Sequence, residues 1–468
     1  MTVLSDVVRD IQRGNRDWEA FAWPTFYAAC KSRFAHMTHE QIVAYQLEKA
    51  RNVVRYAARH ASFFAKLYQD YDLKDVWSLP TVNKATMMAN LTAYNTVGLT
   101  RQQVLDFCLH VEHTRDFSLR LQDINVGMSS GTSGNRGVEI VTRREEAYLR
   151  AVFLARFPFG NALPVGENAI NLAFILRVSA PAFNLNLLGN RLTYISQLGS
   201  LDQIRAQLEA LQPNAVSAPP SMLRILAREK AQGRLDIAPK RLVSYAEVLY
   251  PETRTFLRER FGCPVFEIYK ATEGAIAISC AHGSLHVNED LVALELLDEE
   301  GQPVPPGTPS CRTLVTDLHK TSQPIVRYAL NDIITIRPQP CPCGSAFRVI
   351  ERIDGRSDDV FWGARRGTDD MQFIFPDYIR RAIITVSDDI GEYQVIQQAP
   401  DAVLVRLQVE DQGNVEQIAL GVRDGLRGVF EAYNCHPPRI EIRFEPPLPN
   451  PNSNKLIRIH CAFKVDGE

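Results

Sequence analysis

Hydrophobic and polar positions divide the chain into a helical first part and a longer part in which strands alternate with helices. Residues 18–70 carry apolar side chains at helical spacing, and the segment Thr38 to Gln41 is typical of a helix start. Between about residues 120 and 350, short apolar runs alternate with helical patterns, which predicts a layered α/β domain. The clearest of these patterns are 169–175, 201–211, 215–217, 241–244, 251–261 and 265–268.

Two later segments modify this picture. Residues 287–335 combine many short strand patterns with Gly and Pro turns, which is typical of a smaller β-rich subdomain. After Gly355 the pattern starts again, and we predict two domains, residues 1–355 and residues 356–468. The patterns that define the second, α+β domain are 373–384, 403–409 and 439–444.

The composition narrows the class of protein. A chain of 468 residues is too long for one ordinary domain, and 45% hydrophobic residues can supply a large core. The formal net charge of −2 does not indicate a nucleic-acid partner. The N-terminus lacks a secretory-signal pattern, no run of about 18 apolar residues suggests a membrane span, and the nine cysteines are mostly scattered. We therefore expect a cytoplasmic protein without a membrane or nucleic-acid partner.

A glycine-rich loop at residues 129–137 is the strongest candidate for ligand binding. Seven of its nine residues are Ser, Thr or Gly, and it lies between the strand-like runs 124–126 and 138–141. Small residues let the backbone approach a ligand, and hydroxyl and N–H groups can surround phosphate oxygens. A P-loop or a dinucleotide-binding loop opens a helix, so the strand that follows excludes both. A flexible hairpin turn is the alternative for this loop taken alone.

Four further polar segments follow predicted strands and occur in a fixed order. They are Tyr245-Ala246-Glu247, Tyr269 to Gly274, Arg327 to Asp332 and Arg352 to Asp359. Together with the glycine-rich loop, they resemble the adenylate-forming superfamily, which activates carboxylic acids with ATP, and within it the phenylacetate–coenzyme A ligase and coenzyme F390 synthetase branch. The resemblance covers roughly residues 40–380. It implies a large N-terminal adenylation domain of layered α/β sheets and a small mobile C-terminal lid domain.

The resemblance implies catalytic roles for three residues. Glu273 would hold a Mg²⁺ ion, since a hard cation prefers oxygen ligands near the phosphates of ATP. Thr272 beside it would contact the α-phosphate, and Lys455 would reach the same phosphate as a cation on a flexible side chain. Asp358 falls where the family has the hinge of its lid domain. A solvated surface lysine is the alternative for Lys455.

The resemblance also implies a nucleotide site. Tyr269 would stack on adenine, Asp332 would accept from the ribose hydroxyls, and Arg356 would contact the ribose or the phosphates. Taken singly, such residues are commonly core aromatics, turn residues or surface charges, so the assignment depends on the ordered set. The residues assigned to ATP or AMP binding are Ser130, Gly131, Thr132, Ser133, Gly134, Ala246, Glu247, Tyr269, Asp332 and Arg356.

The chain differs from the family where the acid and the acceptor would bind. Lys270 replaces a Gly, and together with Tyr245 and Ala271 it is expected to border the acid pocket. A long cationic side chain there would either reshape the pocket or pair with an anionic group of the substrate. The segment after the hinge also differs, and in coenzyme A ligases that segment shapes the tunnel for the pantetheine arm. The motifs therefore indicate adenylation more strongly than they indicate coenzyme A as the acceptor.

A second cluster of residues predicts a structural zinc site. Residues 341–344 form a tight Cys-Pro-Cys-Gly turn, and Cys280 lies well before it in the chain. Three thiolates and one imidazole make a closed zinc site, and the resemblance implies His286 as the fourth ligand, with His282 as the rival. Free cysteines with a surface histidine are the alternative. The predicted ligands are Cys280, His286, Cys341 and Cys343.

The expected function is that of an ATP-dependent ligase, which forms an acyl adenylate from a small carboxylic acid and passes the acyl group to a thiol such as coenzyme A. Transfer to an amine or a carrier protein, and transfer of AMP to a hydroxyl as in coenzyme F390 synthetase, stay open. A degenerate, non-enzymatic nucleotide-binding protein is a third alternative, but the chain argues against it by retaining Glu273, Asp332, Arg356 and Lys455. A homodimer is included among the expected assemblies.

Overall fold

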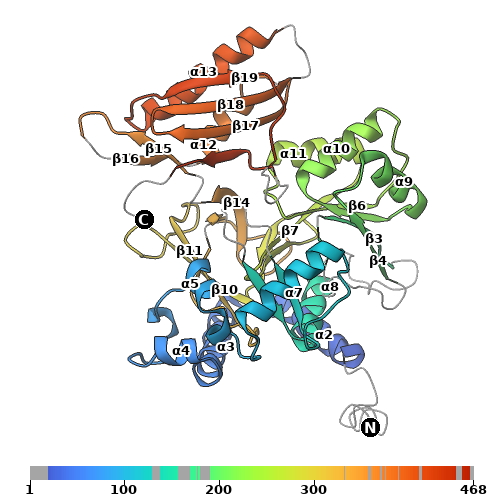
Figure 1. Ribbon diagram of the computed structural model, residues 1–468, viewed down its shortest axis with the longest axis vertical. Coiled ribbons are helices and arrows are strands. Elements are labelled where there is room, and N and C mark those ends of the chain that lie inside the picture. The colour runs from blue at the N-terminus through green and yellow to red at the C-terminus, as the bar shows by residue number, and fades with distance from the viewer. Residues whose placement is uncertain are drawn as a thin grey trace.

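The structure, a computed structural model, describes most of the chain. The described residues are 19–128, 137–156, 169–176, 178–179, 190–330, 332–356, 360–368, 371–374, 376–387, 389–409, 414–449 and 456–463. Figure 1 shows the C-terminal segments stacked above a body that the N-terminal and central segments build.

Helices form the first part of the chain, as the hydrophobic pattern predicts. The longest of them, α3 (His39–His60), begins at Thr38. The Thr38 hydroxyl accepts from the Gln41 backbone N–H, and the Gln41 side chain accepts from the Thr38 backbone N–H, which confirms the predicted helix start. The other elements of this part are α2 (Glu19–His36), α4 (Ser62–Leu67), the 3₁₀ helix η1 (Val76–Ser78), α5 (Lys84–Ala89), α6 (Leu91–Tyr94) and α7 (Arg101–Thr114).

A nine-stranded sheet is the centre of the fold and confirms the predicted α/β class. Its parallel part consists of β4 (Arg191–Ser196), β3 (Asn171–Leu176), β5 (Ala215–Ala218), β6 (Arg241–Tyr245) and β7 (Val265–Ala271), in this spatial order. The antiparallel part continues with β8 (Gly274–Ser279), β9 (Leu285–Val287), β14 (Val349–Arg356) and β13 (Asp332–Ile336). The helices of this region are α8 (Arg143–Arg156), α9 (Leu201–Leu211), α10 (Pro220–Ala231) and α11 (Pro251–Phe261).

Two smaller sheets flank the large one. The predicted β-rich segment supplies a three-stranded antiparallel sheet of β10 (Val292–Leu297), β11 (Arg312–Asp317) and β12 (Tyr328–Leu330), and it also supplies β13 to the large sheet. The strands β1 (Asn125–Met128) and β2 (Val138–Val141) pair as an antiparallel hairpin. The glycine-rich loop therefore connects two strands, as the sequence predicts.

The C-terminal segments build a core of their own. They contain a two-stranded sheet of β15 (Phe361–Ala364) and β16 (Met371–Ile374), and a four-stranded sheet in the order β19 (Arg439–Arg443), β18 (Ala402–Val409), β17 (Ile390–Ala399) and β20 (Ile459–Cys461). Helices α12 (Pro376–Ile384) and α13 (Val415–Ala432) pack closely, since a Cβ at Gly425 would lie 2.8 Å from the Ala382 carbonyl oxygen. One apolar cluster, from Phe361 to Ile459, fills this C-terminal unit. The domain boundary after residue 355 stays a prediction.

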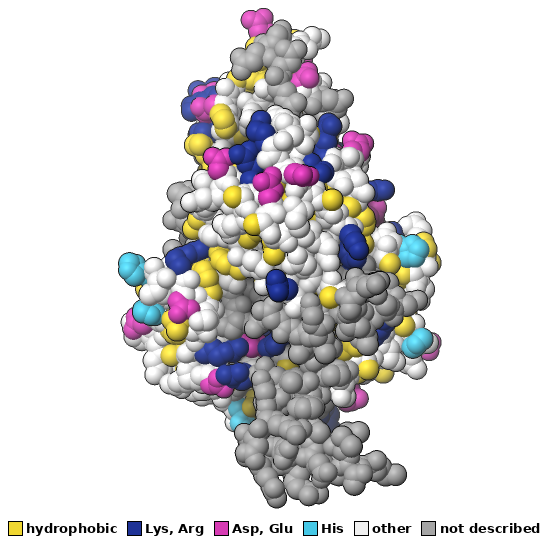
Figure 2. Space-filling model, turned by 90° about the vertical axis from the view of Figure 1, so that its right-hand side faces the viewer, with side chains coloured by type: hydrophobic (Ala, Val, Ile, Leu, Met, Phe, Trp, Pro, Cys, Tyr) yellow, Lys and Arg dark blue, Asp and Glu magenta, His cyan; other side chains and the backbone are white. Residues whose placement is uncertain are grey.

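The surface carries charges of both signs. On the face that Figure 2 shows, Lys and Arg side chains are interspersed with Asp and Glu side chains, in agreement with the balanced net charge of −2. Within the described ranges, none of the helices combines the length and the apolarity that crossing a membrane requires.

Candidate active site

The polar segments that follow β6 and β7 meet at one edge of the large sheet. The two strands are parallel neighbours, with Tyr245 opposite Ile268 in the register. Residues 245–247 therefore lie beside residues 269–273, at the carboxyl ends of the parallel strands, where open α/β sheets bind ligands. Ala246 has a φ of 71°, a left-handed conformation that is uncommon for residues with a side chain and is concentrated at functional turns.

Tyr269, Asp332 and Arg356 come together although they are far apart in the sequence. The Tyr269 hydroxyl donates a hydrogen bond to the Asp332 carboxylate. Arg356 is the antiparallel partner of Asp332 in the register of β13 and β14, and only its backbone is described. The residues predicted for adenine, ribose and phosphate contacts thus gather in one cluster, while their roles stay predictions.

Glu247 is fixed by the first turn of α10. Its carboxylate accepts hydrogen bonds from the Ser221 backbone N–H at 3.2 Å and from the Ser221 hydroxyl at 3.0 Å. A carboxylate at a helix N-terminus is favoured because the free N–H groups there carry partial positive charge. The sequence analysis missed Ser221, whose only signal is the helix-start pattern Pro-Pro-Ser after the strand at 215–217.

Glu273 lies in the turn between β7 and β8 and is 6% exposed. Burial raises the pKa of Tyr94 and of Tyr328, and the negative charge of Glu273 raises it further in both, so the carboxylate lies near two buried phenols. Lys270 lies close enough for its charge to interact with Glu273, but Glu139 already pairs with this lysine, so part of the cost of burying the Glu273 carboxylate is not offset. A divalent cation would offset it, so the site fits the predicted Mg²⁺ ligand, and the neighbouring Thr272 is half-buried.

Lys270 forms an ion pair with Glu139 on the hairpin strand β2. Its Nζ lies 2.8 Å from Glu139 Oε2, and the side chains are 8% and 23% exposed. Burial acts to lower the pKa of Lys270, but Glu139, Tyr245 and Glu273 outweigh it and raise the pKa to about 12. Lys270 is therefore charged and paired within the protein, and Tyr245 beside it packs near Phe174, with ring centroids 5.8 Å apart. The sequence analysis identified Lys270 but missed its partner Glu139.

Several predicted residues cannot be placed. Ser130, Gly131, Thr132, Ser133 and Gly134 of the glycine-rich loop, the predicted hinge Asp358, and Lys455 lie outside the described residues.

The hairpin that carries the glycine-rich loop is anchored to the body. The Gln323 side chain accepts a hydrogen bond from the Ile140 N–H at 2.9 Å and donates one to the Val138 carbonyl at 3.0 Å. Together with the ion pair between Glu139 and Lys270, these bonds hold β2 against the edge of the sheet where the other motifs meet.

The predicted zinc ligands form a compact cluster. The ligand atoms of Cys280, His286, Cys341 and Cys343 all lie within 4.8 Å of one another. The Sγ atoms of Cys280 and Cys341 are 3.8 Å apart, and Cys343 Sγ lies 3.3 Å from His286 Nε2. Ligands about 2.3 Å from a tetrahedral zinc would be separated by about 3.8 Å, so the donor set fits this metal. The rival His282 is exposed and does not belong to the cluster.

The surroundings of the cluster prepare His286 to bind a metal. Its Nδ1 lies 2.8 Å from the Phe347 carbonyl oxygen, which fixes the ring and leaves Nε2 directed at Cys343. Burial lowers the pKa of His286 to about 4, so the imidazole is neutral at pH 7. Phe34 of α2 packs edge-on against the imidazole with a centroid distance of 5.2 Å. The cluster therefore joins the β8–β9 turn, β9 and the loop after β13, and α2 covers it through Phe34.

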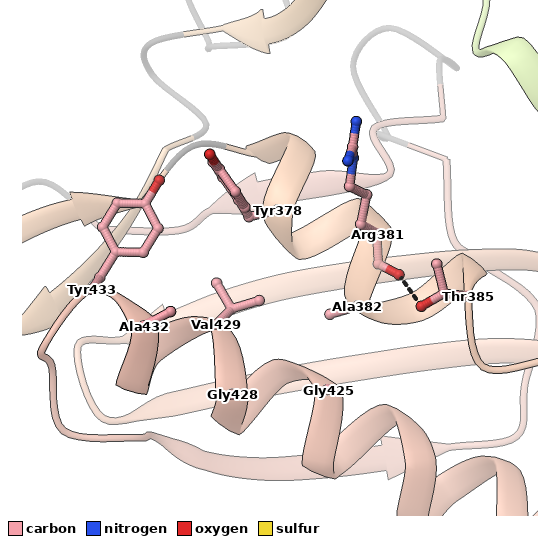
Figure 3. Close-up of a pocket in the computed structure, with 9 residues that line it drawn as sticks. All are labelled: Tyr378, Arg381, Ala382, Thr385, Gly425, Gly428, Val429, Ala432 and Tyr433. Atoms are coloured by element: carbon pink, nitrogen blue, oxygen red, sulfur yellow. Dashed lines mark hydrogen bonds between the residues drawn. The ribbon is translucent and has the colours of Figure 1, made fainter.

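A separate groove lies in the C-terminal unit (Figure 3). Its volume is about 610 Å³, and it runs along α12 and α13. The Tyr378 and Tyr433 rings meet edge-on at one end with a centroid distance of 5.5 Å, while Arg381 points away from them. The lining residues are Tyr378, Arg381, Ala382, Thr385, Gly425, Gly428, Val429, Ala432 and Tyr433, none of which the sequence analysis assigned to the site.

Comparison with known proteins agrees with the geometry. Residues 128–310 match the family model described as AMP-binding enzyme. The chain is 22% identical to a phenylacetate–coenzyme A ligase of Thermus thermophilus over 77% of this chain and 79% of the relative. A solved 2-hydroxyisobutyryl-CoA ligase in the postadenylation state with R3-HIB-AMP is 18% identical, covers 88% of this chain and 87% of its own, and has a TM-score of 0.66. The same ligase with 2-HIB-AMP and CoA in the thioesterification state is 17% identical and covers 92% and 91%, with a TM-score of 0.58.

Proposed function

We propose that this chain, which belongs to the adenylate-forming superfamily of enzymes, activates a small carboxylic acid with ATP and passes the acyl group to a thiol. In the first step, a carboxylate oxygen of the acid attacks the α-phosphorus of ATP, and pyrophosphate leaves. In the second step, a thiolate attacks the acyl carbon, and AMP leaves. Coenzyme A is the first candidate acceptor, because a relative over most of the chain is a phenylacetate–coenzyme A ligase and a protein of similar fold was solved with CoA.

The cluster of Tyr269, Asp332 and Arg356 carries this proposal. A carboxylate fixed by a phenol hydroxyl offers acceptors suited to ribose hydroxyls, and Arg356, the register partner of Asp332, would supply a cation for the phosphates. Residues 245–247 lie at the same edge of the sheet, where Ala246 and Glu247 would line the adenine pocket. Glu273 would hold a Mg²⁺ ion that neutralises phosphate charge. Lys455 and the glycine-rich loop are assigned by resemblance to the phosphates.

The zinc site is a structural part of the proposal. Cys280, His286, Cys341 and Cys343 would hold one zinc ion with all four positions filled, which leaves no position for a substrate. The ion would tie the β8–β9 region to the loop after β13 and would supply stability to the body.

Isotope exchange between pyrophosphate and ATP tests the first step. Exchange should depend on an added acid from a panel that includes phenylacetate, benzoate and 2-hydroxyisobutyrate. Glu273→Gln and Lys455→Ala should each lower it by about 100-fold or more, because they remove charge that stabilises the transition state. The exposed Glu299→Gln and Lys74→Ala serve as matched controls and should retain exchange. Absence of exchange with every acid would contradict the proposal.

The acceptor is tested in a second experiment. With an active acid, coenzyme A, a carrier protein, amines and a hydroxyl acceptor are added separately, and AMP release and the acylated product are measured. Formation of a thioester with coenzyme A supports the proposed acceptor. An amide product, or AMP attached to a hydroxyl, would replace it while leaving the adenylation step intact.

A further inference from the structure

An ion-pair relay connects the C-terminal unit to the body. Glu392 on β17 contacts two arginines, one through each carboxylate oxygen. Arg224 of α10 places its Nε 2.9 Å from Glu392 Oε1, and Arg458 at the start of β20 places its Nη2 2.8 Å from Glu392 Oε2. Arg224 also donates a hydrogen bond to the Gly391 carbonyl oxygen. Glu392 therefore pairs both with Arg224 of the body and with Arg458, which lies directly before the last strand of the C-terminal unit.

The relay is largely withdrawn from water. The side chains of Arg224, Glu392 and Arg458 are 16%, 13% and 8% exposed. Charge pairs in such surroundings are screened less than exposed pairs, and removing one partner leaves the other charge without compensation. A second contact crosses the same boundary, where Arg380 of α12 lies 3.0 Å from Glu252 of α11.

The relay lies next to the candidate nucleotide site. Arg224 lies one turn after Ser221 on α10, and Ser221 binds Glu247 of that site through its backbone N–H at 3.2 Å and its hydroxyl at 3.0 Å. Burial acts to lower the pKa of Arg458, but the negative charges of Glu392 and, more weakly, Glu247 raise it. The backbone of Arg458 is also held within the C-terminal unit, because the Arg458 carbonyl oxygen accepts a hydrogen bond from the Val395 N–H at 2.7 Å. The Gln394 side chain in addition donates to the Ile457 carbonyl at 3.0 Å. Residues 456–458, which follow Lys455 directly, are therefore held by the C-terminal unit near Glu247 of the nucleotide site.

We infer that Arg224 is a positioning residue for acyl-adenylate formation, which acts by holding Glu392 and, through it, Arg458 and the C-terminal unit beside the nucleotide site. The inference rests on the proposed function. Lys455, which directly precedes the held segment, is assigned to the α-phosphate that the acid attacks, so the loss of Arg224 should slow the first step and leave the second step intact.

The two half-reactions of the full-length enzyme separate this role from a general effect on stability. Arg224→Met should lower acid-dependent exchange of pyrophosphate into ATP by about tenfold or more. Thioester formation from preformed acyl adenylate and coenzyme A should stay within about twofold of the wild type. Glu392→Gln should give the same split, and Arg224→Lys should recover part of the exchange because it restores the charge.

A matched control comes from the neighbouring helix. Arg205 of α9 pairs with Glu229 of α10 at 2.6 Å and is 21% exposed, close to the 16% of Arg224, but it forms its ion pairs within the body. Arg205→Met should leave the ratio of the two half-reactions unchanged. Equal losses in both half-reactions for Arg224→Met and Glu392→Gln, or unchanged exchange, would overturn the inference.

Hydrogen exchange gives a readout that needs no substrate. Arg224→Met should raise amide exchange in β17 and β20, whereas Arg205→Met should not. If the wild-type enzyme shows no exchange of pyrophosphate into ATP in the presence of any acid, the proposed function fails. The amide measurement still decides whether Arg224 holds the C-terminal unit. Unchanged protection of β17 and β20 in Arg224→Met would overturn the relay itself.

Discussion

Lys270 and Glu139 form an ion pair that ties the strand before the Thr272-Glu273 turn to the hairpin of the glycine-rich loop. Their charged atoms lie 2.8 Å apart, and the lysine side chain is 8% exposed. The family has a glycine at the position of Lys270. In this chain the position carries a positive charge beside the expected acid pocket, and Glu139 neutralises this charge. We therefore expect an acid without a second negative charge, because Glu139 already neutralises Lys270.

Breaking this pair should destabilise the protein. Glu139→Gln leaves the lysine charge with little solvent and without its ion-pair partner, and we expect a loss of about 2 kcal/mol or more in the free energy of unfolding. Denaturant titration at pH 7 measures this loss. The control is Asp123→Asn in the exposed pair with Arg143, where solvent screens the charges and the expected loss is much smaller. Equal losses in the two variants would contradict the prediction.

Tyr269→Phe should weaken ATP binding. The variant keeps the ring but removes the hydroxyl that donates to Asp332. We expect the KM for ATP to rise about tenfold, equivalent to about 1.4 kcal/mol, with a smaller change in kcat. Steady-state kinetics with varied ATP measure the change, and the exposed Tyr56→Phe should leave KM unaltered. An unchanged KM in Tyr269→Phe would argue against a role of the hydroxyl in placing Asp332.

Purified protein should contain about one zinc ion per chain, and the cluster should account for it. His286→Gln and Cys343→Ser should lose the metal and lower the melting temperature, because a closed site contributes binding energy to the folded state alone. Elemental analysis and thermal unfolding measure the two effects. His282→Gln and Cys311→Ser, which alter residues outside the cluster, should retain zinc. Loss of zinc in His282→Gln would restore the rival ligand.

His319 should make the protein less stable in acid. It is buried against Tyr148, with ring centroids 4.3 Å apart, and its Nε2 lies 2.9 Å from the Asp290 carbonyl. Burial lowers the pKa of His319 to about 4 from 6.5. Since the unfolded chain binds the proton first, the contribution of neutral His319 is complete above pH 6.5 and is lost as the pH falls toward 4, by roughly 3 kcal/mol in total.

The pH dependence of unfolding checks this effect. Between pH 6.5 and 4, His319→Gln should show a shallower loss of stability than the wild type, by up to about 1.4 kcal/mol per pH unit. The exposed His110→Gln should keep the wild-type slope. Identical slopes in His319→Gln and the wild type would show that another group dominates the acid response.

Local patterns in the sequence predict the elements well where the physical cause is local. The helices at 201–211 and 251–261 have the predicted bounds, and Thr38 begins α3, because apolar spacing and capping involve residues within one or two turns. The order of the motifs was likewise enough to predict the fold class and the chemistry. It could not predict that β13 would join the large sheet beside β14, since strand pairing depends on partners far away in the chain.

Long-range contacts decide the rest of the site. Nothing near Lys270 in the sequence indicates Glu139, and nothing near Arg224 indicates Glu392, because each pair forms only when separate elements pack together. The resemblance predicts His286 as the fourth ligand and leaves His282 as the rival, and the structure buries His286 beside three thiols and exposes His282. Residue types and their order thus predict the class of reaction and the four candidate metal ligands, whereas the charge balance around Lys270 and the compactness of the metal cluster follow from the distances that folding creates.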